Sequence, residues 1–148
     1  MSSAERPDVE IEIPARPEYV GVVRHLMGAV ARLGQHSPEF VENAKLAGSE
    51  ACTNAVALSE RTGTQERIEV RATLSDDRLE IAVADRGESA KDVTSELGSP
   101  DTPVTGFEAG LSLPLLEGLV DDLALEVREG GGNVVRMLLV RELEEDGS

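Results

Sequence analysis

The sequence predicts an α+β fold, a two-layer α/β sandwich whose helices cover one face of a mostly antiparallel sheet. Short runs that alternate apolar and polar residues are typical of half-buried strands, and most of these runs come in adjacent pairs. Longer runs with apolar residues at helical spacing separate the pairs. Glycine, proline and serine mark the junctions, as is usual where a chain leaves one element for the next.

The chain opens with one strand and two helices. Residues 9–13, VEIEI, alternate apolar and acidic side chains, and a proline follows the run directly. Residues 19–33 carry apolar side chains at helical spacing and end at Gly34, a typical residue after a helix. A longer helix is predicted from Pro38 to about residue 62, with Ser37 as its N-cap.

Two strands and a long irregular segment follow these helices. Residues 67–74 and 78–84 alternate in the manner of strands, and the short polar turn SDD between them predicts a hairpin. After Asp85 the chain is polar and rich in glycine, serine and proline up to Gly110. A segment of this length without periodicity indicates a lid or binding loop, or else disorder.

The last part of the chain regains a regular pattern. A short helix is predicted to begin around Ser112 and Pro114. Two strands follow, at about residues 123–128 and 134–140, and the glycine-rich turn EGGGN separates them. We therefore expect a single domain over residues 1–148.

The composition excludes several classes of function. The chain has 148 residues and a formal net charge of -15, which argues against direct binding of nucleic acid or of an anionic membrane surface. No apolar run approaches the length that spans a membrane. The single cysteine, Cys52, falls toward the polar side of its helix and is expected to be a plain structural thiol. These features predict a cytoplasmic protein with an aliphatic core.

Polar residues interrupt the apolar side of the second helix. At about 100° per residue, Asn43, Glu50 and Asn54 form one stripe with apolar side chains on both flanks. The opposite side, which we expect to face solvent, holds Glu42, Lys45, Ser49 and Glu60. Because burying an unpaired carboxylate costs several kcal/mol, the stripe implies a hidden partner, a cation or a ligand near Glu50.

A second carboxylate is predicted to face the helices. Asp85 has the strand parity of Leu79, Ile81 and Val83, so the alternation that buries those three also turns Asp85 inward. A strand-end carboxylate accepts a hydrogen bond from an exocyclic amine, and Gly87 leaves room for a flat ring such as adenine. An ordinary Asp-Arg-Gly turn is the alternative interpretation.

The far end of the irregular segment supplies a third feature. Gly110 and Ser112 lie just before the predicted helix, where unpaired N–H groups attract phosphate. An ordinary helix start with Ser112 as N-cap is the alternative. Together the three features fit one ligand: a base at Asp85, phosphates near Gly110, and a metal beside Glu50 and Asn54. Magnesium suits this arrangement because it binds amide and phosphate oxygens and keeps several waters.

These residues make the chain similar to the anti-sigma-factor serine kinases of the RsbW type. That group belongs to the GHKL ATPase superfamily of gyrase, Hsp90 and the histidine kinases. The resemblance covers almost all of the chain and rests on KLAGSEACTNAV, VADRGES and AGLSLPLLEGLVDDL, which match the family's three boxes in order and spacing.

The resemblance implies a Bergerat-type fold that binds ATP and Mg²⁺. It also implies an anti-sigma factor of the stress response that sequesters a sigma factor, phosphorylates a serine of an anti-anti-sigma partner and forms a homodimer. By position, Glu50 corresponds to the catalytic base, Asn54 to the magnesium ligand and Asp85 to the adenine-binding aspartate. The nucleotide-lining positions are Gly87, Gly110, Leu111 and Ser112. Residues 88–109 correspond to the ATP lid, and residues 1–8 and 142–148 are expected to be flexible tails.

A second hypothesis keeps the fold but not the catalysis. In it the chain is a non-catalytic module that sequesters a sigma factor without useful ATP turnover. Ser112 in place of a glycine, the following Pro114, and Ala57-Leu58-Ser59 where the family often has basic residues and histidine favour this hypothesis. The strand at the N-terminus and the lack of a phosphoacceptor helix argue against a histidine-kinase catalytic domain.

Overall fold

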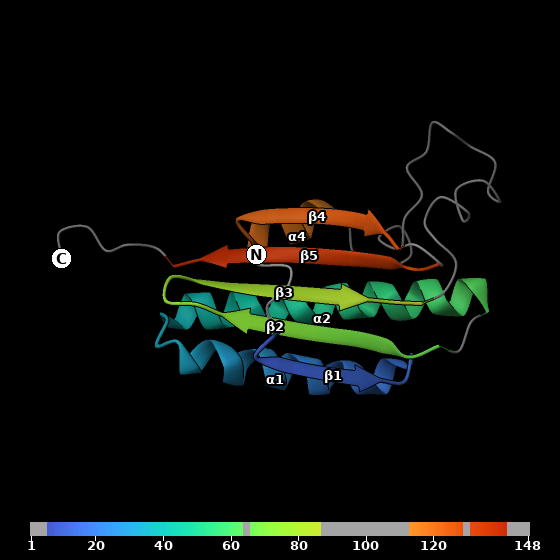
Figure 1. Cartoon of the computed structure of the whole chain (residues 1–148), viewed down its shortest axis with the longest axis horizontal. Helices are drawn as coiled ribbons and strands as arrows, with labels where there is room; N and C mark the ends of the chain where they lie inside the picture. Colours follow the sequence, from blue (N-terminus) through green and yellow to red (C-terminus); the bar gives the residue numbers. More distant parts are fainter. Residues whose placement is uncertain (1–5, 64–65, 87–112, 129–130, 142–148) are drawn as a thin grey trace.

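The computed structural model describes residues 6–63, 66–86, 113–128 and 131–141, in which helices cover one face of a five-stranded sheet (Figure 1). The elements, in chain order, are β1 (Val9–Ile13), η2 (Pro17–Tyr19), α1 (Val20–Leu33), α2 (Pro38–Thr62), β2 (Ile68–Leu74), β3 (Arg78–Ala84), α4 (Leu113–Leu119), β4 (Asp122–Val127) and β5 (Asn133–Val140). The strand order is β1-β2-β3-β5-β4, and every pairing is antiparallel. The predicted fold class is therefore confirmed.

The register of the sheet separates an apolar face from a charged face. On the helix side, Val70 of β2 is opposite Val83 of β3, which is opposite Val135 of β5. On the other side, Arg71 is opposite Ala82. The core between sheet and helices is aliphatic, as the scarcity of aromatic residues predicts, and its largest fully buried side chains include Met27, Ile68, Leu79, Ile81, Leu116 and Met137.

Helix α2 begins and ends as its sequence predicts. The Ser37 side chain accepts a hydrogen bond from the Phe40 N–H at 3.1 Å, and Pro38 occupies the first turn. Gly63 ends the helix in the left-handed conformation with φ of 77°. Helix α1 also stops at Gly34, but there the left-handed residue is Gln35, with φ of 60°.

The prediction of which side of α2 faces solvent is partly wrong. Glu42 and Glu60 are exposed, but Ser49 is only 1% exposed and its hydroxyl donates to the Leu46 carbonyl at 3.2 Å. Cys52, placed toward the polar side by the sequence, is fully buried, and burial raises the pKa of its thiol to about 12. The reason is that α2 contacts α1 and α4 as well as the sheet, so it is buried over a wider arc than one apolar stripe implies.

No helix in the described ranges is long and apolar enough to cross a membrane. This finding agrees with the hydropathy pattern of the sequence.

Gly48 allows α1 and α2 to approach closely just before Glu50. A Cβ at Gly48 would lie 2.6 Å from Cγ of the fully buried Met27. We expect Gly48→Ala to lower the free energy of unfolding by about 1–3 kcal/mol, because overpacking outweighs the gain of about 1 kcal/mol in helix propensity. Chemical denaturation measures the change.

Gly21→Ala is the matched control, since a Cβ at this exposed position of α1 meets nothing within 4 Å. We expect it to raise the free energy of unfolding by up to about 1 kcal/mol. Equal stabilisation by both substitutions would show that the helices do not need a glycine at residue 48.

His36 lies in the turn between α1 and α2, stacked on Phe40 with ring centroids 3.7 Å apart. Both of its ring nitrogens are buried, and neither has a hydrogen-bond partner among the residues described. Burial of the ring, and then the positive charge of Arg141, lower the pKa of His36 from its usual value. The folded protein therefore favours neutral His36.

We expect the free energy of unfolding to fall as the pH drops below about 6.5, the pKa of an unperturbed histidine. Below that pH the unfolded chain binds the proton before the folded chain does, so the contribution of His36 is complete above pH 6.5 and is lost as the pH approaches the folded pKa. Denaturation between about pH 7 and 5 should show this slope, reduced in His36→Phe, which keeps the stacking.

His25→Asn serves as the control because His25 is exposed on α1. It should leave the slope unchanged. A His36→Phe protein with the slope of the parent would assign the pH dependence to other groups.

Candidate functional site

Helix α2 places two of the predicted site residues side by side. Asn54 is buried, with 3% of its surface exposed, and Glu50 one turn before it is half-buried. Among the residues that the structure describes, no cationic side chain pairs with the Glu50 carboxylate. Asn43, the third member of the predicted stripe, is also half-buried. The stripe therefore places a carboxylate and an amide on the inner side of α2, as the sequence predicted.

Asp85 directly follows β3, and by alternation its side chain lies on the same face of the sheet as those of Ile81 and Val83. Its pairing extends the register in which Ala84 is opposite Val134, so that Asp85 lies beside Asn133 at the start of β5. The Asp85 N–H donates to the Asn133 carbonyl at 2.9 Å. The carboxylate is 5% exposed and accepts two hydrogen bonds from Asn133, from the backbone N–H to Oδ1 at 3.3 Å and from Nδ2 to Oδ2 at 3.4 Å.

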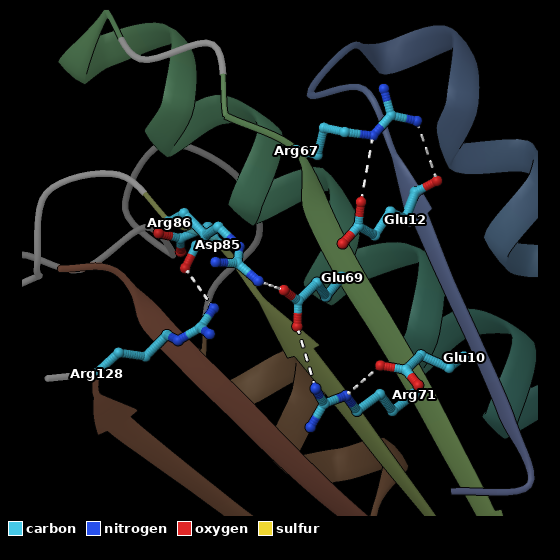
Figure 2. Close-up of polar contacts among 8 residues, drawn as sticks. All are labelled: Glu10, Glu12, Arg67, Glu69, Arg71, Asp85, Arg86 and Arg128. Carbon is cyan, nitrogen blue, oxygen red and sulfur yellow. Dashed lines mark hydrogen bonds and ion pairs between the residues drawn. The ribbon is translucent and has the colours of Figure 1, made fainter. Parts of the chain in front are cut away.

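Arginines surround this strand end on the outer side of the sheet (Figure 2). Arg128, which follows β4, donates from Nη1 to the Asp85 carbonyl at 3.1 Å. Arg86 forms an ion pair with the buried carboxylate of Glu69. The same carboxylate also pairs with Arg71, with Nη2 of Arg71 3.4 Å from Oε1 of Glu69. Burial of the guanidinium, and then the positive charge of Arg86, lower the pKa of Arg128, while the Asp85 carboxylate opposes the change.

The two groups of predicted residues come from neighbouring elements, α2 and the end of β3. Figure 1 shows that the C-terminal half of α2 runs behind the C-terminal end of β3. The two elements are in contact. The remaining predicted residues, Gly87, Gly110, Leu111 and Ser112, lie outside the described residues.

The described residues offer single oxygen ligands and no metal cage. No group of three or more His, Cys, Asp or Glu residues that could hold a metal ion occurs within the described ranges. The buried amide of Asn54 is nevertheless a ligand type that Mg²⁺ accepts, since this ion usually takes one or two protein oxygens together with phosphates and water. A carboxylate that faces the helix layer, such as Asp85, accepts hydrogen bonds but cannot donate them while it is ionised.

Sequence reasoning missed Asn133 and Arg128. Both flank the glycine-rich turn between β4 and β5. The sequence predicted that turn, but it did not show that the turn lies beside Asp85. The contact exists because β5 pairs with β3 rather than only with β4, which no local pattern reveals. The run of glycines was the available signal, because glycine often marks a close approach of another backbone.

Comparisons with known proteins identify the family of the chain. Residues 13–139 match the family model described as a histidine kinase-like ATPase domain. "Serine-protein kinase RsbW" of Bacillus licheniformis is 37% identical over 145 residues, which cover 95% of this chain and 91% of that protein. The protein of the same name from Bacillus subtilis (strain 168) is 35% identical over 127 residues, 82% of this chain and 79% of the relative.

Two solved structures share the fold at low sequence identity. The SiaB-SiaC complex from Pseudomonas aeruginosa matches with a TM-score of 0.67 and 14% identity, over 93% of this chain and 92% of the matched chain. The RsbU and RsbW domains of Rv1364c from Mycobacterium tuberculosis match with a TM-score of 0.64 and 21% identity, over 93% of this chain and 33% of that one. The family model and the sequence relatives show that the chain belongs to the histidine kinase-like ATPase family and, within it, to the serine-protein kinases of the RsbW type.

Proposed function

We propose that the chain is an anti-sigma factor and protein-serine kinase that binds Mg-ATP and phosphorylates a serine of an anti-anti-sigma partner. The observation that carries the proposal is the placement of Glu50, Asn54 and Asp85 on the inner sides of α2 and β3 in a chain that aligns over 95% of its length with a serine-protein kinase. The family resemblance adds a sigma factor as the sequestered partner, a homodimer and a cytoplasmic location to the proposal.

In this proposal the adenine binds at the end of β3. The Asp85 carboxylate accepts a hydrogen bond from the exocyclic amine, and Gly87 allows the ring to approach the backbone. The phosphates lie near Gly110, Leu111 and Ser112, at the start of α4. Residues 88–109 act as the lid that covers the nucleotide.

Glu50 and Asn54 act on the transferred phosphoryl group. The Asn54 amide oxygen would hold a magnesium ion, which would supply positive charge to neutralise the phosphates. The seryl hydroxyl of the partner gives its proton to Glu50 while its oxygen attacks the γ-phosphorus. The bond from that phosphorus to the bridging oxygen of ADP breaks, and ADP leaves. A half-buried carboxylate with no cationic partner among the described residues suits this role, because no ion pair has to break first.

Glu50→Gln tests the base. We expect phosphoryl transfer from labelled ATP to the purified anti-anti-sigma partner to fall about 10²–10⁴-fold, because the isosteric amide cannot take the proton. Nucleotide affinity, measured by calorimetric titration with Mg-ATP, should change little. Glu60→Gln on the exposed side of the same helix is the control and should keep full activity.

Two results would decide against the kinase. Undiminished transfer by Glu50→Gln would remove this residue from the mechanism. An unmutated protein that binds no Mg-ATP would favour the non-catalytic module that only sequesters a sigma factor.

Asp85→Asn tests the adenine site. We expect the affinity for ATP to fall roughly 10–100-fold, because a hydrogen bond to a charged acceptor contributes about 1.5–3 kcal/mol. The new amide would also direct an N–H group toward Asn133 or toward the adenine amine. Calorimetric titration measures the affinity, and circular dichroism verifies the fold. Asp122→Asn, an exposed aspartate of β4, should bind ATP as the parent does; equal affinity of all three proteins would contradict the assignment of Asp85.

A further inference from the structure

The face of the sheet opposite the helices holds a hollow of about 250 Å³, called here the outer hollow. Its floor includes Ala82 and Ala84 of β3, whose side chains are too short to fill the space beside the longer side chains of the neighbouring strands. In the register of the sheet, Arg71 of β2 and Arg136 of β5 are the two neighbours of Ala82. Because strands lie about 4.8 Å apart, the backbones of these two arginines stand roughly 10 Å from each other across the hollow.

Positive charge is in excess around the outer hollow, although the chain as a whole has a net charge of -15. Three arginines and two glutamates line the hollow: Arg71, Arg128, Arg136, Glu69 and Glu126. The Glu69 carboxylate also forms an ion pair with Arg86, so a fourth arginine shares the same negative charge (Figure 2). An anion placed in the hollow would offset this excess.

Arg128 shows the excess most directly. Its Nη1 donates to the neutral Asp85 carbonyl at 3.1 Å, and within the described ranges this arginine forms no salt bridge with a carboxylate. Burial, and then the positive charges of Arg86 and Arg71, lower the pKa of Arg128, while the Asp85 carboxylate opposes the change. Like charges therefore crowd this guanidinium, and a bound anion would reduce their repulsion.

The arginines on the two sides of the floor keep N–H donors for such an anion. Arg136 uses Nε for Glu126 at 3.1 Å. Arg71 uses Nε for Glu10 and Nη2 for Glu69. A guanidinium has five N–H donors, arranged as a fork that matches a carboxylate, so each of these side chains can serve a further acceptor.

The exposure of the arginines indicates which kind of anion suits the outer hollow. The side chains of Arg71 and Arg136 are 48% and 45% exposed. A single ion pair at such exposure contributes little, so a free anion would be held weakly. Several carboxylates on one segment engage several arginines together, because the first contact raises the effective concentration of the next.

We propose that the outer hollow docks an acidic segment of a partner protein, with two or more carboxylates held among Arg71, Arg128 and Arg136. This inference goes beyond the proposed function, because it requires neither ATP nor phosphoryl transfer. Its failure would leave the kinase proposal intact, and the failure of the kinase proposal would leave the docking site intact.

The test uses a fluorescent hexaglutamate peptide as the probe and a hexaglutamine peptide as its neutral counterpart. Fluorescence anisotropy at about 50 mM salt, where screening is modest, measures the dissociation constants. We expect Arg136→Gln to weaken hexaglutamate binding about 5-fold, since it removes one exposed charge contact. Ala82→Leu should weaken it about 10-fold without changing any charge, because the larger side chain fills the floor of the hollow.

Arg24→Gln is the matched control. Arg24 is exposed on α1, in the helix layer, and its loss changes the net charge by the same amount as Arg136→Gln. Its dissociation constant for hexaglutamate should stay within about 2-fold of the parental value, because distant exposed charges are screened. Arg136→Lys keeps the charge but loses the fork, so its affinity should fall between those of the parent and Arg136→Gln. Circular dichroism verifies that each variant folds.

Two results would overturn the docking site. The first is a parental protein that binds hexaglutamate no better than hexaglutamine. The second is parental affinity in both Arg136→Gln and Ala82→Leu. Should Ala82→Leu fail to fold, Arg136→Gln decides: parental affinity overturns the inference, and a loss that Arg24→Gln does not share supports it.

Three further results would overturn the acidic protein segment as the occupant. A thymidine hexanucleotide that binds more tightly than hexaglutamate, with the same losses in the variants, would assign the outer hollow to nucleic acid. Displacement of the peptide by free glutamate at an equal concentration of carboxylate would assign it to a small anion. A parental dimer that becomes a monomer in Ala82→Leu, measured by light scattering, would make this face an interface between two copies of the chain.

Discussion

The antiparallel pairing of β3 with β5 is the constraint on which the site depends. It places Asp85 opposite Asn133, turns its carboxylate toward the helices and sends the neighbouring Arg86 to the outer face. Because side chains alternate along a strand, a slip of one residue would move Asp85 to the charged face and bring Arg86 to the helices. The apolar pairs on the helix side, such as Val83 with Val135, resist this slip since it would expose them.

Helix α2 contributes the other half of the site through its depth of burial. It is packed between α1, α4 and the sheet, and Gly48 brings it close to Met27 of α1. A long, well-buried helix offers little freedom to the residues on it, so Glu50 and Asn54 are held by packing on both sides. Stability and function are therefore connected in this helix: the residues that fill the core also position the proposed base and metal ligand.

The sequence predicts most of the fold because its signals are local. Alternation, the Ser37 cap and the glycine ends fix the strands and the two long helices to within one residue at each end in the described ranges. Asp85 was found by the same means, since its direction follows from the strand before it. Ser49 and Cys52 were misplaced because the burial of a helix depends on its neighbours, which a helical pattern does not contain. Asn133 and Arg128 were missed because they reach Asp85 through a pairing between strands far apart in the chain.

The charge around Asp85 explains how a buried carboxylate can remain an acceptor in a chain of net charge -15. Burial disfavours the ionised form, but two N–H donors from Asn133 and the nearby Arg128 guanidinium favour it. Burial and the positive charge of Arg86 lower the pKa of Arg128, whereas the Asp85 carboxylate raises it. Because the attraction between two opposite charges is mutual, the Arg128 charge in turn stabilises the ionised carboxylate. Only the ionised form is purely an acceptor, and adenine presents a donor at its exocyclic amine. In the proposed adenine site, Arg128 behind the sheet would therefore contribute to base recognition without reaching the base, because its charge favours the ionised carboxylate.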